Sequence, residues 1–225
     1  MLELNRLYNM DCLKAMRDMP DKCVDLAVVD PPYFAEANLH YHNGGSVSGT
    51  GVKRNDYKKS SAWNVPDSAY YTELLRVSKE QIIFGINYFD FCGVPPGRII
   101  WNKQRAGLIN SFSDGEIASC SLIKSVRIFR YMWDGMLQGN MKNKERKFHV
   151  TQKPVALYQW ILANYAKPGD KILDTHVGSG SSLIACIEAG HDYIGFELDE
   201  HYHRLATERI ENYTAQMSLF RMESV

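Results

Sequence analysis

The second half of the chain alternates between strand-like and helix-like segments, and this alternation limits the fold more than any other feature. A short strand-like run at 171–174 is followed by a glycine turn and by an apolar, helix-like segment at 181–189. A further apolar run at 193–197 leads into a helix that Asp199 can cap and that extends to about Tyr213. Strands that alternate with helices in this way lie parallel and are joined by right-handed crossovers. The sequence therefore predicts an α/β protein with a doubly wound, mostly parallel sheet.

The first half predicts more strands of the same sheet. Residues 24–29 form a continuous apolar run, which is typical of a strand that is buried on both faces. Asp67 can cap a helix that runs to about Lys79. Two later runs, 116–124 and 126–133, favour strand, and we expect them to pair as an antiparallel hairpin at the edge of the sheet. The other predicted elements are strands at 4–10, 81–84 and 97–101 and helices at 12–19 and 154–166.

Length and composition indicate a single globular domain over residues 1–225. The apolar fraction is 45% and the charged fraction is 23%, which excludes a mainly disordered or fibrous chain. The chain has no apolar run of about 18 residues, and its first residues lack the apolar core of a signal peptide, so we expect a cytoplasmic protein. Two polar segments fit no element. We expect residues 35–66 to be a mobile insert and residues 134–148 to be a basic loop.

The five cysteines are widely spaced, and no two of them form a C-x-x-C pair. An odd number without paired spacing argues against a disulfide framework or a structural zinc site. His149, His176 and the neighbouring His201 and His203 lack metal-ligand spacing, so we expect no bound metal.

The segment around Asp174 and Gly178-Ser179-Gly180 predicts a nucleotide-binding turn. Glycines at the end of a strand let the backbone approach a ligand closely, and the first amides of the following helix face that ligand. Glu197, at the tip of the next strand, can accept hydrogen bonds from both hydroxyls of a ribose. Leu183 replaces the third glycine of the dinucleotide fingerprint, and no P-loop lysine follows the glycines. A carboxylate before the glycines suits S-adenosylmethionine, which has an amine and a sulfonium and carries no phosphate. A plain strand-to-helix turn is the alternative.

Asp30-Pro31-Pro32-Tyr33 is the most specific motif of the chain. It directly follows the buried run at 24–29, and α/β sheets bind their ligands at the carboxyl ends of such strands. A proline-stiffened turn that only closes the strand is the alternative. The position favours a catalytic turn.

Together, these motifs resemble those of the amino-methylating DNA methyltransferases, which modify N6 of adenine or N4 of cytosine. Family members carry D/N/S-P-P-Y/F, D-P-F-x-G-S-G and H-P-T-Q-K-P, which are similar to residues 30–33, 174–180 and 149–154 of this chain. The motif order, with the catalytic turn first, is similar to that of the permuted β group. The resemblance covers the chain from Asp11 to about Tyr213. It implies a circularly permuted, Rossmann-like class I methyltransferase fold, with S-adenosyl-L-methionine as cofactor and S-adenosyl-L-homocysteine as product. The implied cofactor-binding residues are Asp11, Thr151, Gln152, Lys153, Asp174, Thr175, His176, Gly178, Ser179, Gly180, Glu197 and Leu198.

The resemblance also gives the catalytic turn a role for each group. The exocyclic amine of adenine is a poor nucleophile because its lone pair is delocalised into the ring. The Asp30 carboxylate and the Pro31 carbonyl can each accept one of its N–H groups, which favours a pyramidal nitrogen. Tyr33 offers a face on which an extruded base stacks. Aspartate at the first position is typical of adenine enzymes. We therefore expect direct transfer to N6 of adenine in DNA, with N4 of cytosine in DNA and an adenine in RNA as alternatives.

Two positions depart from the family pattern: Thr175-His176 replaces Pro-Phe, and Val150 replaces a proline. The first departure changes the packing that is expected below the cofactor. A nucleotide- and DNA-binding protein without turnover therefore stays open as an alternative of another class.

Charge is balanced overall, with 26 basic and 26 acidic residues, but it is unevenly distributed. Residues 174–200 contain six acids and no lysine or arginine, whereas basic residues gather in the middle of the chain. This distribution favours binding to double-stranded DNA, and we expect the 35–66 insert to become ordered on DNA and to carry part of target recognition. A cognate restriction endonuclease as partner, and a monomeric or a homodimeric state, stay open. The expected DNA-binding residues are Lys53, Arg54, Lys58, Lys59, Lys103, Arg105, Lys142, Lys144, Arg146 and Lys147.

Overall fold

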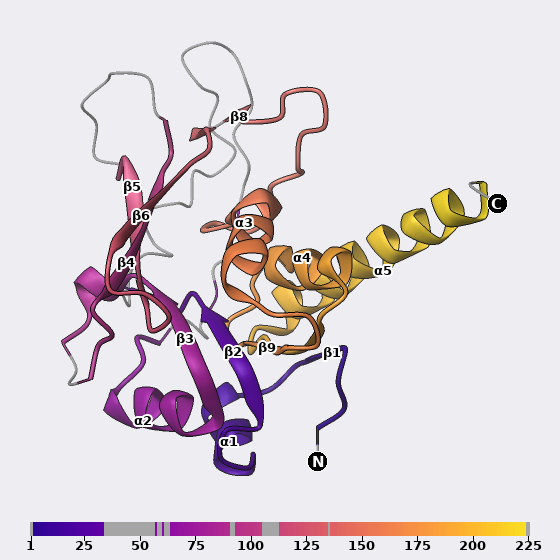
Figure 1. Cartoon of the computed structure of the whole chain (residues 1–225). Helices are drawn as coiled ribbons and strands as arrows, with labels where there is room; N and C mark the ends of the chain where they lie inside the picture. Colours follow the sequence, from indigo (N-terminus) through magenta and orange to yellow (C-terminus); the bar gives the residue numbers. More distant parts are fainter. Residues whose placement is uncertain are drawn as a thin grey trace.

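The computed structural model describes residues 2–33, 57, 60, 64–90, 93–104, 113–134 and 136–223, with side chains as far as residue 217. One sheet of eight strands lies at its centre, in the order β1-β10-β9-β2-β3-β5-β4-β6 (Figure 1). The strands are β1 (Arg6–Tyr8), β2 (Val24–Val29), β3 (Ser78–Phe84), β4 (Gly97–Asn102), β5 (Gly115–Cys120), β6 (Val126–Arg130), β9 (Lys171–Asp174) and β10 (Asp192–Phe196). β7 (Trp133–Asp134) and β8 (Leu137–Gln138) form a separate antiparallel pair.

The sheet is mostly parallel and doubly wound. β1, β10, β9, β2 and β3 run parallel, and the strand order reverses between β9 and β2. β5 is antiparallel to β3 and to β4, and β6 is parallel to β4. The predicted fold class is therefore confirmed. The expected pairing of residues 116–124 with residues 126–133 is wrong, because β4 lies between β5 and β6 and forms hydrogen bonds with both.

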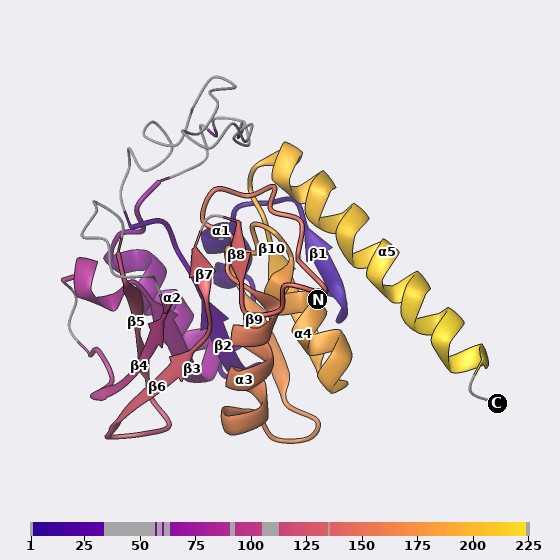
Figure 2. The same cartoon turned by 90° about the horizontal axis from the view of Figure 1, so that it is seen from above.

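Helices cover both faces of the sheet (Figures 1 and 2). α1 (Cys12–Arg17) and α2 (Ser68–Val77) pack on one face. α3 (Val155–Tyr165), α4 (Ser181–Ala189) and the first part of α5 (Glu200–Glu223) pack on the other face. A short 3-10 helix, η1 (Ile86–Tyr88), follows β3. α5 continues beyond the predicted end at about residue 213, and Figure 2 shows its far end projecting past the sheet.

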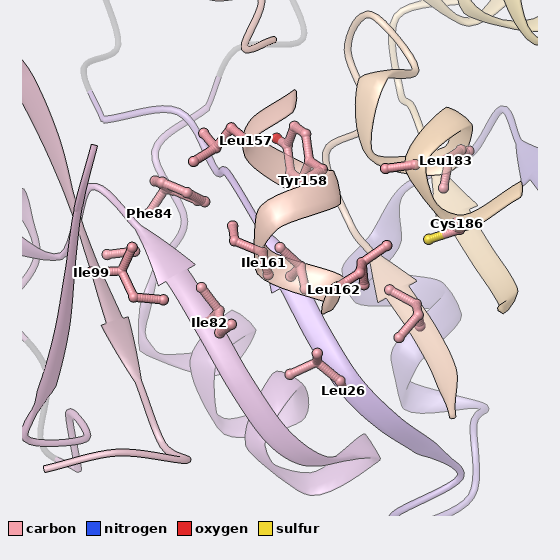
Figure 3. Close-up of a cluster of buried hydrophobic side chains, with 14 of the residues drawn as sticks. Leu26, Ile82, Phe84, Ile99, Leu157, Tyr158, Ile161, Leu162, Leu183 and Cys186 are labelled. Carbon is pink, nitrogen blue, oxygen red and sulfur yellow. The ribbon is translucent and has the colours of Figure 1, made fainter. Parts of the chain in front are cut away.

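Side chains alternate along each strand, so the central strands contribute to two cores. Leu26 and Val28 of β2 belong to the core below α3 and α4, whereas Ala27 and Val29 belong to the core below α1 and α2. Each fully buried leucine or isoleucine stabilises the fold by roughly 1.5–3 kcal/mol relative to an exposed one. Figure 3 shows the first core, in which α3 lies across β2 and β3 and its buried side chains are Leu157, Tyr158, Ile161 and Leu162.

Aspartates cap two helices where the sequence predicts caps. Asp67 Oδ1 accepts hydrogen bonds from the amides of Ala69 and Tyr70 at 3.0 and 3.2 Å. Asp199 Oδ1 accepts hydrogen bonds from two amides in the first turn of α5. α2 ends at Val77 rather than at about residue 79, because the chain enters β3 at Ser78 and pairs there with β2.

The two segments that were expected to be loops differ in how far they are described. The segment 134–148 contains β8, and hydrogen bonds of 2.8 Å join the Gln138 side chain to the backbone N–H and C=O of Glu145. Of the 35–66 insert, the description covers only Tyr57, Ser60 and residues 64–66, so its expected mobility lies outside the described residues. Within the described part of the chain, no helix is long and apolar enough to cross a membrane.

Candidate active site

One edge of the sheet carries the predicted motifs. β2, β3, β9 and β10 run parallel, so their carboxyl ends meet at the same edge. Asp30 follows β2, Gly85 follows β3, Asp174 ends β9 and Glu197 follows β10. β5 runs in the opposite direction, so its start, with Glu116, reaches this edge too. The topology thus brings groups from five strands together.

A cavity of about 710 Å³ opens at this edge. It spans the reversal between β9 and β2, where open α/β sheets bind ligands, and its volume is that of a pocket for a drug-sized molecule. The catalytic turn and the glycine turn both line it, although they lie far apart in the sequence. The predicted residues that line it are Asp11, Asp30, Pro31, Pro32, Tyr33, Lys103, Thr151, Lys153, Thr175, His176, Gly178, Ser179, Glu197 and Leu198.

The ring of Tyr33 lies directly over Gly85. Gly85 has a φ of +72°, and a Cβ atom there would lie 2.0 Å from Tyr33 Cε1, so only glycine leaves room for the ring. The ring also stacks on Tyr88, with centroids 5.2 Å apart and an interplanar angle of 17°. The Tyr33 hydroxyl donates a hydrogen bond to Asp30 Oδ1. Packing therefore orients the Tyr33 ring, and the hydrogen bond from its hydroxyl orients the Asp30 carboxylate.

Two carboxylates and two ammonium groups gather beside this turn. Lys153 Nζ donates a hydrogen bond to Asp30 Oδ2 and lies 2.7 Å from Glu116 Oε2. Lys103 Nζ lies 2.8 Å from the other carboxylate oxygen of Glu116. The Lys153 side chain is 3% exposed, so carboxylates rather than water neutralise its charge. We call Asp30, Glu116, Lys103 and Lys153 the ionic cluster.

The two carboxylates of the ionic cluster have different acidities. Burial raises the pKa of Asp30, the Lys153 ammonium opposes this rise, and the Glu116 carboxylate adds to it. Burial also acts to raise the pKa of Glu116, but Lys153 and Lys103 outweigh it and lower that pKa to about 2. Burial raises the pKa of Tyr33 well above its usual range, so its hydroxyl keeps its proton at neutral pH. Of the two acids, Asp30 is therefore the one that protonates first as the pH falls.

The glycine turn is held by Glu197 and by His149. Glu197 Oε2 accepts a hydrogen bond of 2.8 Å from the Gly178 amide. Gly178 has a φ of +56°, and a Cβ atom there would lie 3.2 Å from two atoms of the His149 ring. That ring packs edge-on against Tyr202 of α5, with centroids 4.4 Å apart. Side chains from the end of β10 and from the segment before α3 therefore hold the turn in place.

Thr175-His176, the departure from the family pattern, forms a polar contact network. The Thr175 hydroxyl lies 2.6 Å from the Tyr70 hydroxyl and 3.0 Å from His176 Nδ1. The His176 ring packs edge-on against Tyr70, with centroids 5.4 Å apart. Burial lowers the pKa of His176 to about 4, so its ring is neutral at pH 7. One hydrogen bond from Thr175 and one ring contact from His176 therefore join this pair of residues to Tyr70.

Four predicted cofactor residues take places that the sequence does not indicate. Asp174 accepts hydrogen bonds from the Ser182 hydroxyl and from a backbone amide of the turn, and burial raises its pKa to about 7. The Gln152 side chain bonds to backbone groups of the preceding loop at 3.2 Å. Gly180 packs against α5, and Lys153 belongs to the ionic cluster. Asp174, Gln152 and Gly180 shape the turn and its surroundings without lining the cavity.

Several lining residues escape the sequence analysis, and four of them contact the predicted motifs: Gly85, Glu116, Tyr70 and His149. Gly85 had a usable signal, since it directly follows a predicted buried strand. Glu116 had a weaker one, namely a carboxylate at the start of a strand-like run. His149 lies inside a family motif, but its sequence gives no indication that the ring covers Gly178. Among the described residues, no three His, Cys, Asp or Glu side chains are grouped as metal ligands.

The structure describes five of the ten predicted DNA-binding residues, and they differ in their surroundings. Lys103 lines the cavity, within the ionic cluster. Lys142, Lys144 and Arg146 are exposed on the loop after β8. Lys147 Nζ lies 4.1 Å from the centroid of the Trp133 ring, and burial lowers the pKa of Lys147 to about 8. The remaining predicted residues lie outside the described part of the chain: Lys53, Arg54, Lys58, Lys59 and Arg105.

A doubly wound sheet whose glycine turn shares one cavity with a D-P-P-Y turn defines a protein of the Rossmann-like methyltransferase class. A family model described as DNA methylase, of the N6 and N4 type, matches residues 53–208. The match covers more than half of the chain. The chain therefore belongs to this family of amino-methylating DNA methylases.

Individual relatives agree with this assignment. The chain is 25% identical over 250 aligned residues to the type II methyltransferase M.HinfI of Haemophilus influenzae, covering 92% of this chain and 68% of that protein. It is 23% identical over 222 residues to the putative methylase YubD of Escherichia coli K12, covering 92% of this chain and 90% of that protein.

Solved structures show the same fold. The cytosine-N4-specific PvuII DNA methyltransferase aligns with a TM-score of 0.58 at 12% identity, covering 92% of this chain and 90% of that one. The M1.HpyAVI–SAM complex aligns with a TM-score of 0.52 at 20% identity, covering 91% and 98%. Since one of these structures is named for cytosine N4, family membership leaves the target base open.

Proposed function

We propose that this chain transfers a methyl group from S-adenosylmethionine to the N6 amine of an adenine that is extruded from DNA. The observation that carries this proposal is the single cavity of about 710 Å³ that the catalytic turn and the glycine turn both line. A methyl donor and an amine acceptor must meet within a few ångströms, and one shared cavity meets that requirement.

The residues of the glycine side fit the proposed cofactor. Glu197 lines the cavity at the tip of β10, where an acid can accept hydrogen bonds from ribose hydroxyls. Gly178 and Ser179 directly precede Gly180, the N-cap of α4, and they line the cavity together with Asp11 and Thr151. When bound, S-adenosylmethionine supplies an electrophilic methyl group on a sulfonium that leaves as a neutral thioether.

The residues of the catalytic turn fit an amine acceptor. A carboxylate offers about four lone-pair positions, so Asp30 can accept an N–H from the base beside its bonds to Tyr33 and Lys153. The Pro31 carbonyl accepts the second N–H. These two hydrogen bonds draw the amine out of conjugation, and the Tyr33 ring provides a stacking face. Transfer is then a direct in-line displacement, in which the chain contributes positioning and electrostatics.

Adenine is the proposed target because aspartate stands at the first position of the D-P-P-Y turn. N4 of cytosine in DNA is the nearest alternative, since the same acceptor pair serves either amine. We further propose double-stranded DNA as the substrate, bound in part by the exposed lysines after β8.

The test is mass spectrometry of nucleosides from unmethylated DNA that has been incubated with the protein and S-adenosylmethionine. We expect N6-methyladenine, and we expect Asp30→Asn to lower its rate of formation by at least about 100-fold. Asp25→Asn is the matched control, because Asp25 lies on β2, the strand that Asp30 follows, and bonds to Lys79 and to the Lys171 amide, outside the cavity.

Each outcome decides between the candidates. N4-methylcytosine would keep the mechanism and overturn the choice of base. Methylation of RNA alone would overturn the choice of nucleic acid. Cofactor binding without methyl product on either polymer would favour a binding protein without turnover.

A further inference from the structure

Glu116 is the carboxylate of the ionic cluster that lies outside every sequence motif. It lies at the start of β5, the strand that runs against its neighbours, and this direction brings its side chain to the edge where β2 and β3 end. The side chain is 17% exposed and bonds to two lysines, Lys153 at 2.7 Å and Lys103 at 2.8 Å. Its Oε2 is also 3.4 Å from the Tyr33 hydroxyl. Glu116 thus contacts the same two side chains, Tyr33 and Lys153, that donate hydrogen bonds to Asp30.

The contacts of Lys153 show what Glu116 does for Asp30. An ammonium that is paired with Asp30 alone would hold one carboxylate oxygen tightly and withdraw electron density from it. Here Glu116 shares the same ammonium, and the four charges of the ionic cluster sum to zero. Because the Lys153 side chain is almost fully buried, water does not screen this competition.

We propose that Glu116 is a positioning residue for the methyl transfer reaction: by sharing the Lys153 ammonium, it keeps Asp30 a strong hydrogen-bond acceptor for the amine of the target base. The inference rests on the proposed function for the reaction itself. It goes beyond that function because it assigns a second carboxylate, outside the D-P-P-Y turn, to the acceptor side of the site.

The acidities agree with this division of roles. Glu116 has its pKa lowered to about 2, so it stays ionised wherever the protein is assayed. Asp30 has its pKa raised by burial and by Glu116, against Lys153. Glu116 is therefore a fixed negative charge. Asp30 is the group that, once protonated, no longer accepts the hydrogen bond from the amine.

Other titratable groups face Asp30 from the surrounding elements. The hydroxyls of Tyr33, and of Tyr158 on α3, have pKa values raised well above 10 by burial, so both are neutral in the assay range. Asp174, at the end of β9, has its pKa raised to about 7 and interacts with Asp30. Its contribution is the same in variants of Glu116 and Lys103, so shifts between those variants report on the ionic cluster.

The test is the pH profile of kcat at saturating DNA and cofactor. Glu116→Gln keeps the shape of the side chain and removes its charge. We expect kcat to fall about 10- to 100-fold. Without the Glu116 charge, the Lys153 ammonium stabilises the ionised form of Asp30 more strongly, so the pKa of Asp30 falls. We therefore expect the acidic limb of the profile to move to lower pH by about one unit. Glu80→Gln on β3 is the control, because Glu80 lies outside the cavity, and it should leave rate and profile unchanged.

A second variant predicts the opposite sign. Lys103→Met frees Glu116 to pair more strongly with Lys153, which weakens the hold of Lys153 on Asp30, so the acidic limb should move to higher pH. General damage to the fold would lower the rate at every pH without opposite shifts. If Glu116→Gln fails to fold, the pH profile of Lys103→Met is the test. A shift of its acidic limb to higher pH supports the proposal, and a shift to lower pH or an unchanged limb overturns it.

The outcomes also separate this inference from the proposed function. A wild-type profile in Glu116→Gln, combined with an inactive Asp30→Asn, would overturn the role of Glu116 and leave methyl transfer intact. Absence of methyl product from the unmodified protein would overturn the function first.

Discussion

At the scale of single residues, the contact between Gly85 and Tyr33 is the most demanding in the site. Gly85→Ala introduces a Cβ atom 2.0 Å from the Tyr33 ring, so the ring must move away and its hydroxyl must leave Asp30. We expect methyl transfer to fall at least about 10-fold, because the stacking face and the orientation of Asp30 are both lost. The measurement is kcat alongside the free energy of unfolding in urea.

Gly190→Ala is a matched control for that substitution. Gly190 also has a φ of +72°, but nothing lies within 4 Å of the Cβ atom that alanine would add. Both variants should lose about 1–2 kcal/mol of stability from left-handed strain, while only Gly85→Ala loses activity. Equal activity in the two variants would contradict the proposed role of the Tyr33 ring.

The residues that the sequence could predict are those whose chemistry is carried by a contiguous motif. Asp30 and Tyr33 follow a buried apolar run, and Gly178 precedes a helix, so local pattern alone points to the cavity edge. Glu116 and Tyr70 reach the cavity through long-range packing. No local pattern encodes a strand's direction in the sheet or the neighbour of a helical side chain. Tyr70 therefore could not be inferred, and Glu116 had only the weak signal of a carboxylate at the start of a strand-like run.

At the scale of elements, the loop after β8 is joined to α5 by one ion pair. Glu145 Oε2 lies 2.8 Å from Arg209 Nη2, and Glu145 Oε1 accepts a hydrogen bond from the Val155 amide at the start of α3. Arg209 also donates to the Ser179 carbonyl, in the glycine turn, at 2.9 Å. We expect a double-mutant cycle of Arg209→Met and Glu145→Gln to give a coupling free energy of about 1–3 kcal/mol in urea unfolding.

The exposed pair Arg6 and Glu3 supplies the comparison for this cycle. Its side chains are 57% and 71% exposed, whereas those of Arg209 and Glu145 are 18% and 19% exposed. The same cycle with Arg6→Met and Glu3→Gln should give little measurable coupling, because water and salt screen the pair. A coupling at Arg209 and Glu145 as small as that at the exposed pair would show that the loop is not held by this contact.

Elements were predicted well where periodicity is local and less well where pairing is long-range. The strand at 24–29 and the helix at 181–189 have the predicted bounds, because an apolar run and a glycine turn mark their ends. The hairpin between residues 116–124 and 126–133 was wrong, since adjacency in sequence favoured a pairing that β4 interrupts. The residues of β5 and β6 carry no pattern that indicates the strand β4 between them.

At the scale of the whole molecule, exposed basic groups lie at two ends of the sheet, but only one end adjoins the cavity. Lys142 and Lys144 are exposed after β8, on the loop that hydrogen bonds join to α3 and α5 beside the cavity. Lys167 and Lys171 are exposed at the start of β9, which is the end opposite the glycine turn.

If DNA lies over the cavity, then Lys142→Ala with Lys144→Ala removes two phosphate contacts, and the slope of log K against log salt becomes shallower by about 1.8. Lys167→Ala with Lys171→Ala changes the net charge equally and should leave the slope unchanged. Equal changes in both double variants, measured by fluorescence anisotropy over a salt series, would mean that overall charge rather than this face governs binding to DNA.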